Sequence, residues 1–116
     1  MKANDPTKTA RFQQAQMYIN FYRKTILDHY NLPFSKFVKL PQERRLELSL
    51  KVSSTTAKVV AEAFEIPIES LCRRKRNLET AGKLQTSRKQ AVCPYTGAYA
   101  LLLTTDESLF NSKGYV

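Results

Sequence analysis

The sequence predicts a mainly α-helical domain that ends in a β-hairpin. Up to Gly82, apolar residues recur at the three- and four-residue spacing of helix faces. Beyond it, two extended runs flank the turn sequence Pro94-Tyr95-Thr96-Gly97. A chain of 116 residues can bury one core but not two. We therefore expect a single domain over residues 10–105, between a flexible tail at 1–9 and a second tail at 106–116.

The first predicted helix runs from Ala10 to about Tyr30. Its apolar face comprises Ala15, Tyr18, Ile19, Tyr22 and Ile26 and is widened by Phe12, Met17 and Phe21. A face this broad must be covered, either by the core of the same chain or by a second copy of it. The sequence leaves both alternatives open, so a homodimer through this helix is among the partners we consider.

A connector and a second helix follow. Residues 31–40 contain a proline, and the rings of Phe34 and Phe37 are expected to fill the core. Pro41 then favours a helix that continues to about Val52, because its fixed φ suits a first helical turn.

The stretch from Thr56 to Gly82 predicts two helices joined by a tight turn. The first can be capped by Ser54 or Thr55. Its expected inner face consists of Ala57, Val60, Ala61 and Phe64. The second is expected at about 67–81, since a proline at the start and a glycine after the end are typical helix signals. So short a connection makes the helices cross sharply, as in a helix-turn-helix.

The second helix of this pair separates leucines from polar and charged side chains. Leu71 and Leu78 share its inward face. The outward and flanking residues are Glu69, Ser70, Arg73, Arg74, Arg76 and Asn77. Lys75 lies on the same helix face as the two leucines. We therefore expect its aliphatic stem to lie over the core, with its ammonium group at the rim.

The charge distribution indicates a polyanionic partner. The chain carries a net charge of +9, and residues 67–90 hold seven cations against two acids. This concentration favours nucleic acid over an anionic membrane or an acidic protein. Because the second helix of a helix-turn-helix enters the major groove, we predict that its six outward and flanking residues contact double-stranded DNA. Its arginines would neutralise phosphates and read guanine, while Glu69 would accept from cytosine or stabilise the helix start.

The hairpin is expected at residues 84–105. Arg88 and Lys89 belong to its first strand, and we place them near the tip, where they would make a second contact to a duplex. The polar segment that follows contains Phe110 and Tyr115 as candidate anchors.

Nine residues fit the pattern I-P-x-x-S-[VL]-x-R-x-L-x-x-L-E-x-A-G: Ile66, Pro67, Ser70, Leu71, Arg73, Leu78, Glu79, Ala81 and Gly82. Over about residues 41–105 the chain thereby resembles the winged helix-turn-helix family, and C-P-x-T-G at 93–97 resembles the wing of small bacterial and bacteriophage members. The resemblance implies a winged helix-turn-helix preceded by a long N-terminal helix. It also implies a double-stranded DNA-binding protein, a small transcription regulator, with helix 67–81 in the major groove and hairpin 84–105 as the wing. The chain departs from the pattern at Lys75, where the family has leucine.

A fold of this kind does not fix its function, so a second hypothesis stands beside the first. The domain could be an interaction module of phage type that docks on an acidic host, replication or transcription protein. Structured RNA is a third, weaker alternative. Competition between duplex DNA and duplex RNA would separate it from the first, because a helix cannot enter the narrow major groove of A-form RNA.

No catalytic, metal or cofactor site is predicted. The chain lacks paired carboxylates in an apolar setting, a glycine-rich phosphate loop and a Ser/His/Asp or Cys/His arrangement. Cys72, Cys93 and His29 are too dispersed for structural zinc, and we expect two free thiols. No run approaches the roughly 20 apolar residues of a membrane span, and the amino end lacks the apolar core of a secretion signal. We therefore expect a non-enzymatic cytoplasmic protein without a membrane partner.

Overall fold

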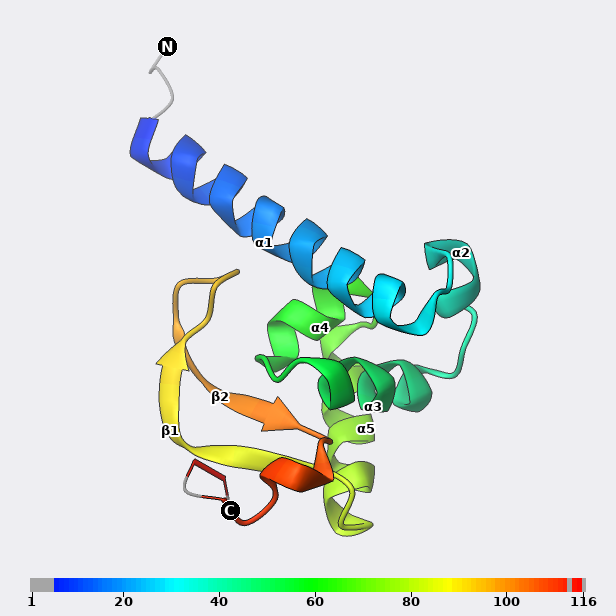
Figure 1. Cartoon of the computed structure of the whole chain (residues 1–116). Coiled ribbons are helices and arrows are strands. Elements are labelled where there is room, and N and C mark those ends of the chain that lie inside the picture. The colour runs from blue at the N-terminus through cyan, green and yellow to red at the C-terminus, as the bar shows by residue number, and fades with distance from the viewer. Residues whose placement is uncertain (1–5, 113, 116) are drawn as a thin grey trace.

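The computed structural model describes residues 6–112, 114 and 115. Its helices, in chain order, are α1 (Pro6–Tyr30), α2 (Phe34–Phe37), α3 (Gln42–Val52), α4 (Ala57–Ala63) and α5 (Ile68–Thr80). An antiparallel hairpin of β1 (Gln85–Val92) and β2 (Tyr99–Thr104) follows, and then the 3-10 turn η1 (Glu107–Leu109). The predicted fold class, mainly helical with a C-terminal hairpin, is confirmed (Figure 1).

The core lies where α1, α3, α4 and α5 meet one face of the hairpin. Its buried side chains include Ile19, Ile26, Leu46, Leu50, Val60, Phe64, Leu71 and Leu103. Figure 1 shows α1 lying across this core, with its first half extending past the other helices. One end of α1 therefore belongs to the core, while the other stands clear of it.

Helix α1 begins at Pro6, four residues before its predicted start, and ends at Tyr30 as predicted. Proline is favoured in a first helical turn because it has no N–H group to leave unpaired there, which accounts for the earlier start. Residues 1–5 of the predicted tail lie outside the described residues.

The broad apolar face of α1 divides into two surfaces. Ala15, Ile19, Tyr22 and Ile26 are buried, so α1 completes the core of its own chain, the first of the two alternatives. The residues expected to widen that face remain in solvent. Phe12, Met17 and Phe21 are 69, 67 and 68% exposed.

The connector supplies two aromatic rings to the body, as predicted. Phe37 is fully buried, and its ring centroid lies 4.6 Å from that of Phe64. Phe34 is half-buried beneath Arg23, whose Cζ lies 4.6 Å from the centre of the ring. Helix α3 then starts directly after Pro41 and ends where the sequence predicts.

Helix α4 is not capped by the residues that the sequence suggests. Ser54 and Thr55 bind β2 instead: the N–H of Leu103 donates to the Thr55 carbonyl at 2.8 Å, and Ser54 Oγ donates to the Leu103 carbonyl at 2.7 Å. The residue before the helix is Thr56, and its side chain makes no capping hydrogen bond. The cap prediction is wrong because the hairpin, which lies far along the chain, pairs with the Ser54 hydroxyl and the Thr55 backbone, and the helix begins one residue later, after Thr56.

The buried face of α4 is broader than predicted. Val60 and Phe64 are buried as expected, whereas Ala57 and Ala61 are only partly buried. Val59 and Ala63 are also buried, because α4 packs against both α1 and α5. A helix that is covered on two sides has apolar residues around more than one face, so the sequence pattern does not define a single buried face.

Helix α5 lies within one residue of its predicted limits at each end. Before it, Glu65 takes a left-handed φ of 57°, which ends α4 and redirects the chain. After it, Gly82 has a φ of 73°, and the N–H groups of Gly82 and Lys83 bind the carbonyls of Glu79 and Leu78. This pairing satisfies the last carbonyls of the helix and fixes its end.

A bulge interrupts β1 and changes the expected position of two cations. The strand register jumps between Thr86 and Gln90, where three residues of β1 face one residue of β2. The hydroxyl of Ser87 fills the gap, accepting an N–H from β2 and donating to the carbonyl of Lys89, both at 2.8 Å. The prediction that places Arg88 and Lys89 near the tip is wrong. The bulge holds them in mid-strand, about 13 Å before the turn at the spacing of extended chain.

The segment after β2, expected as a tail, folds back along β1. The side-chain carbonyl of Gln85 accepts the N–H of Asn111 at 2.9 Å. Tyr115 is buried, and its hydroxyl forms a hydrogen bond with that of Ser54. Tyr115 is therefore an anchor, while Phe110 is only half-buried.

Candidate nucleic-acid interface

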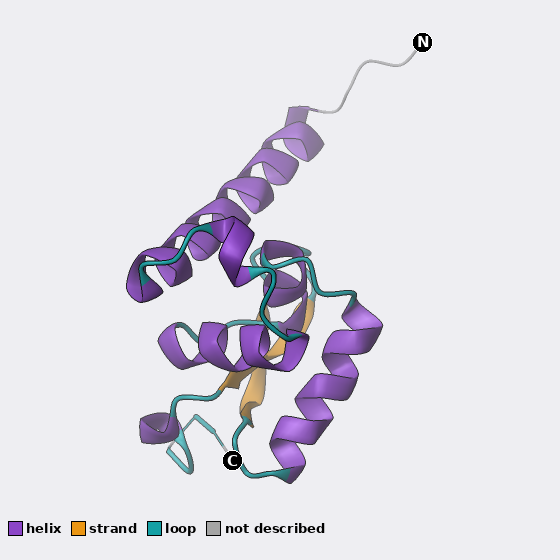
Figure 2. Ribbon diagram, turned by 90° about the vertical axis from the view of Figure 1, so that its right-hand side faces the viewer, coloured by secondary structure: helices purple, strands orange, loops and turns teal. Residues whose placement is uncertain are grey.

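Helix α5 is fixed to the body by one face and leaves the other in solvent. Leu71 and Leu78 are buried as predicted, and the helix packs against α3 and α4. Of the outward and flanking residues, Glu69, Arg73, Arg74, Arg76 and Asn77 are exposed and Ser70 is half-buried. Figure 2 shows α5 at the edge of the molecule, with one long side free of other elements. The structure thus brings six of the eight predicted site residues onto one helix.

The arginines of α5 are available to a ligand. Within the described part of the chain, no carboxylate lies within ion-pair distance of Arg73, Arg74 or Arg76. Arg73 donates a weak hydrogen bond to Ser70 Oγ, at 3.5 Å. Exposed guanidinium groups without an acidic partner can bind phosphate oxygens or the edge of guanine bidentately.

Two polar residues of the predicted site are tied to the protein. Glu69 lies in the first turn of α5, where the helix dipole favours a carboxylate. Asn77 Nδ2 donates to Glu43 Oε1 of α3 at 3.4 Å. A base or phosphate would have to compete with these interactions, so the three arginines form the most accessible part of the surface.

Lys75 lies where the sequence predicts. Its side chain is 27% exposed, and its Nζ is 3.5 Å from Oε1 of Glu79, one turn further along α5. It borders a groove of about 220 Å³ between α4, α5 and the hairpin, together with Cys72 and Leu101. The stem therefore lies beside apolar residues, and the ammonium group is at the rim.

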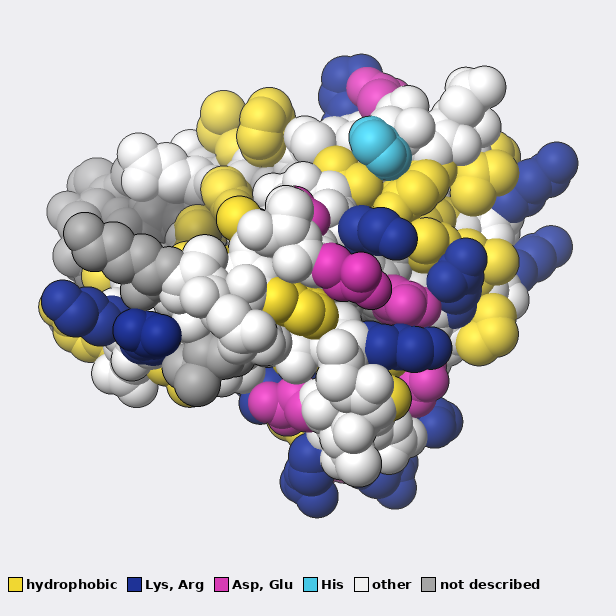
Figure 3. Space-filling view, turned by 60° about the horizontal axis from the view of Figure 1, so that its bottom comes forward, with side chains coloured by type: hydrophobic (Ala, Val, Ile, Leu, Met, Phe, Trp, Pro, Cys, Tyr) yellow, Lys and Arg dark blue, Asp and Glu magenta, His cyan; other side chains and the backbone are white. Residues whose placement is uncertain are grey.

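Arg88 and Lys89 belong to a different surface from the α5 arginines. Both are exposed on the bulge of β1, where they border an open groove of about 730 Å³ beside Gly114. Figure 3 shows Lys and Arg side chains in separate groups, with acidic and uncharged side chains between them. The cations predicted for the site therefore occupy two places, one on the helix and one on the hairpin.

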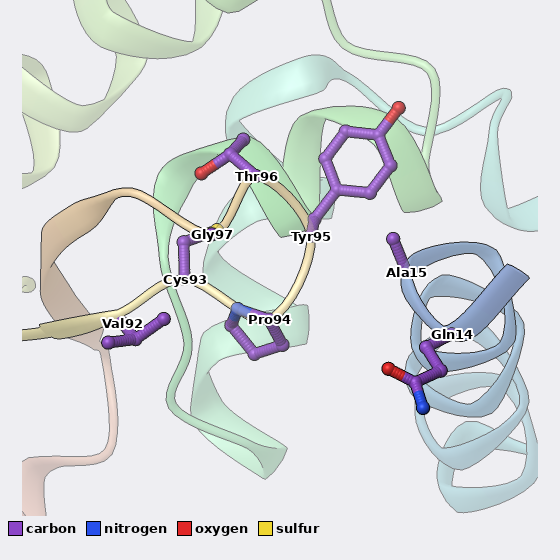
Figure 4. Close-up of a pocket in the computed structure, with 8 residues that line it drawn as sticks. All are labelled: Gln14, Ala15, Val92, Cys93, Pro94, Tyr95, Thr96 and Gly97. Atoms are coloured by element: carbon purple, nitrogen blue, oxygen red, sulfur yellow. The ribbon is translucent and has the colours of Figure 1, made fainter. Parts of the chain in front are cut away.

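The turn of the hairpin faces the body. A cleft of about 450 Å³ lies between residues 92–97 and Gln14 and Ala15 of α1 (Figure 4). Tyr95 in this turn lies beside Glu62 of α4, and burial together with that carboxylate raises the pKa of the Tyr95 hydroxyl. The turn thus lies across a cleft from α1, whereas the bulge with Arg88 and Lys89 faces solvent.

Cys93 anchors the base of this turn. Its Sγ lies 3.0 Å from Oγ1 of Thr56, at the start of α4. Burial raises the pKa of the Cys93 thiol, but hydrogen bonds from Thr56, Thr96 and the turn backbone outweigh that effect and lower the pKa overall. Both cysteines are free thiols, with Cys93 buried and Cys72 half-buried.

Sequence reasoning missed two arginines that position the turn before α5. Arg45 is buried, and its guanidinium donates to the carbonyls of Leu40 and Phe64 at 2.9 and 2.7 Å. Arg23 of α1 donates to the carbonyl of Ala63 at 2.8 Å. These cations satisfy carbonyls at the C-terminal end of α4, where the helix dipole is negative. No sequence signal marks them, since their partners are backbone groups on other elements.

Burial lowers the pKa of the Arg45 guanidinium, and nearby Glu65 opposes that shift. Arg45 thus carries a buried charge whose compensation comes from carbonyl dipoles and a neighbouring acid. Its position links α3, α4 and the residue that redirects the chain into α5.

Comparisons of the chain with models of protein families, with curated proteins and with solved structures found no match. Among the described residues, no helix combines the length and the apolar character needed to cross a bilayer. The interpretation of the α5 surface therefore rests on its geometry and charge.

Proposed function

We propose that the protein binds double-stranded DNA as a small winged helix-turn-helix regulator of transcription, with α5 in the major groove. The observation that carries the proposal is the division of α5 into a buried leucine face and an exposed face whose three arginines have no acidic partner among the described residues. A helix fits the major groove, and arginine is the side chain best suited to read guanine there.

The order of elements supports the architecture. Helices α3 and α4, a short connection, α5 and a hairpin follow one another along the chain. The hydrogen bond between Leu103 and Thr55 ties β2 to the segment before α4, so hairpin and helices form one body. This connection fixes the position of the hairpin relative to α5, as a wing requires.

The two cationic surfaces would have different tasks. Arg73 and Arg76 are three residues apart on the outward side of α5, and in a major groove they would contact base edges and the flanking phosphates. Arg88 and Lys89, on the bulge of β1, would bind the phosphate backbone as the wing. Phosphate contacts would supply most of the affinity, and one or two arginines of α5 the sequence preference.

A charge-matched pair of double variants tests this proposal. Arg73→Ala with Arg76→Ala removes two cations from α5, and Lys36→Ala with Lys39→Ala removes two exposed cations from the connector. Affinity for duplexes selected from a random library is measured by fluorescence anisotropy. We expect at least a tenfold loss for the α5 variant and less than about a threefold loss for the connector variant, because only α5 would touch the duplex.

Equal losses in the two double variants would show attraction by net charge alone and would contradict a site on α5. A random library that yields no enriched sequence would contradict a regulator that reads bases.

Docking on an acidic protein is the second candidate function, as a phage-type interaction module that engages a host replication or transcription protein. The observation that favours it is the exposed cross-strand pair Val92 and Tyr99 beside Leu101, an apolar hairpin surface that DNA does not require. Stoichiometric binding of a purified acidic partner that Tyr99→Ser weakens, without retention on duplex DNA, would favour this function over the first.

A further inference from the structure

Helix α1 exposes an apolar pair on the side that faces away from the core. Met17 and Phe21 are one turn apart, share a face, and are 67 and 68% exposed. Ile19 and Ile26 lie on the opposite side of the helix and are fully buried. Exposed side chains of this size at the spacing of one helix face are typical of a contact surface.

The segment around this pair is free of charge. Residues 12–22, FQQAQMYINFY, contain no acid and no base, although the chain as a whole carries +9. The next charged residues on this face, Lys24 and Asp28, pair with each other at 2.9 Å. Over residues 12–22 an acidic partner would find no cation, whereas two copies of a strongly basic chain can approach most easily at a neutral surface.

The polar residues beside the pair suit contact with an identical surface. Gln13, Gln14 and Asn20 are exposed. Asn20 Oδ1 accepts from Gln16 Nε2 at 3.3 Å within the helix, which leaves the Asn20 amide nitrogen as a donor. The Gln13 and Gln14 amides carry both donors and an acceptor, so the set can pair with itself across a twofold axis.

We propose that a second copy of the chain covers this face, with the two α1 helices packed antiparallel around Met17 and Phe21. In that arrangement Met17 of each chain meets Phe21 of the other, a favourable sulfur–aromatic contact. An aromatic side chain carries about 150–250 Å² of surface, so the exposed parts of this pair offer roughly 300 Å² per copy. A specific interface needs about 1,000 Å² in total, and the two pairs supply more than half of it.

Sedimentation equilibrium of the full chain without DNA tests the proposal, so its result does not depend on the proposed function. We expect a concentration-dependent dimer at micromolar protein. Phe21→Glu should raise the dissociation constant at least tenfold, because it would bury a carboxylate against the apolar Met17 side chain of the other copy.

Phe12→Glu is the matched control. Phe12 is 69% exposed but lies two and a half turns from Phe21, on the other side of the helix. We expect it to leave the dissociation constant within about twofold of the starting value. Thermal unfolding followed by circular dichroism verifies that both variants are folded.

A chain that stays monomeric up to about 200 μM would overturn the proposal, as would equal effects of Phe12→Glu and Phe21→Glu. Binding of the monomer to anionic vesicles through Phe21, with no dimer in their absence, would assign the face to a membrane surface instead and would also overturn it.

Discussion

Helices α1 and α5 have similar buried faces and different exposed faces. Each buries a pair of large aliphatic residues in the common core, Ile19 and Ile26 in α1 and Leu71 and Leu78 in α5. The outer face of α5 carries three exposed arginines. The outer face of α1 carries no charge over residues 12–22 and exposes two large apolar side chains.

The difference shows how one core can present two kinds of contact surface. Charges on α5 attract a polyanion over a Debye length of about 8–10 Å, and salt weakens that attraction. The apolar pair on α1 acts only in contact, and its strength does not depend on screening. The partners proposed for the two helices can therefore be separated by their response to salt.

Salt gives the largest expected contrast. If the α5 surface and the hairpin engage about six phosphates, the log–log slope of DNA affinity against salt is near −5, or about a thousandfold loss between 50 and 200 mM. The dimer dissociation constant should change by less than about threefold over the same range. Anisotropy and sedimentation measure the two constants, and a flat response of DNA binding would rule out phosphate neutralisation as its mechanism.

Truncation of the inner faces should affect both helices equally. Ile19→Ala and Leu71→Ala should each lower the free energy of unfolding by about 2–5 kcal/mol, because both side chains are fully buried. At protein concentrations low enough to keep the chain monomeric, Met17→Ala, on the exposed face, should stay within about 0.5 kcal/mol. Urea unfolding provides the values. A cost below about 1 kcal/mol for Ile19→Ala would mean that α1 is not part of the cooperative core.

Arg45 tests how firmly the start of α5 is held. Arg45→Met should cost about 1–3 kcal/mol, because the carbonyl of Phe64 loses its buried donor. Arg44→Met is the control, since Arg44 is exposed and its ion pair with Glu47 lies at the surface. Equal urea midpoints for the two variants would show that the contacts of Arg45 add nothing to stability.

Arg74 distinguishes base reading from phosphate binding. Arg74→Ala should reduce affinity by roughly 1–3 kcal/mol and relax the preference at one position if it reads a base. If Arg74 binds phosphate, the loss should be uniform across sequences. Repeating the library selection with the variant separates these outcomes, and an unchanged affinity would exclude Arg74 from the interface.

Lys75 should give the smallest effect. Lys75→Leu replaces a half-buried lysine beside apolar residues, so thermal stability should be preserved or raised, with little change in DNA binding. Melting temperature and anisotropy measure the two properties. A collapse of binding with the fold intact would show that Lys75 faces the nucleic acid.

Elements with local end signals were the most predictable. Pro41 and Gly82 mark the start of α3 and the end of α5, and the structure agrees with both to within a residue or two. The leucine face of α5 was also predictable, because a helix that packs on one side only repeats its apolar residues with the helical period.

Features that depend on distant partners could not be predicted in the same way. Ser54 was suggested as a cap but binds β2, and the position of Arg88 depends on a bulge that the hydroxyl of Ser87 completes. Arg45 gave no signal at all, because its acceptors are carbonyls on other elements. Every residue has a backbone carbonyl, so the identity of the accepting residue does not reveal such a hydrogen bond in the sequence.

The sequence by itself determined the helical class, the limits of α3 and α5, the hairpin and the concentration of cations between residues 67 and 90. These follow from local periodicity, helix signals and composition, which act within a few residues. Only the tertiary structure decided which apolar residues of α1 are buried, where Arg88 and Lys89 lie, and how Arg45 and Arg23 hold the end of α4. Those outcomes depend on which segments meet in space, because a side chain becomes buried or paired only when another part of the chain covers it.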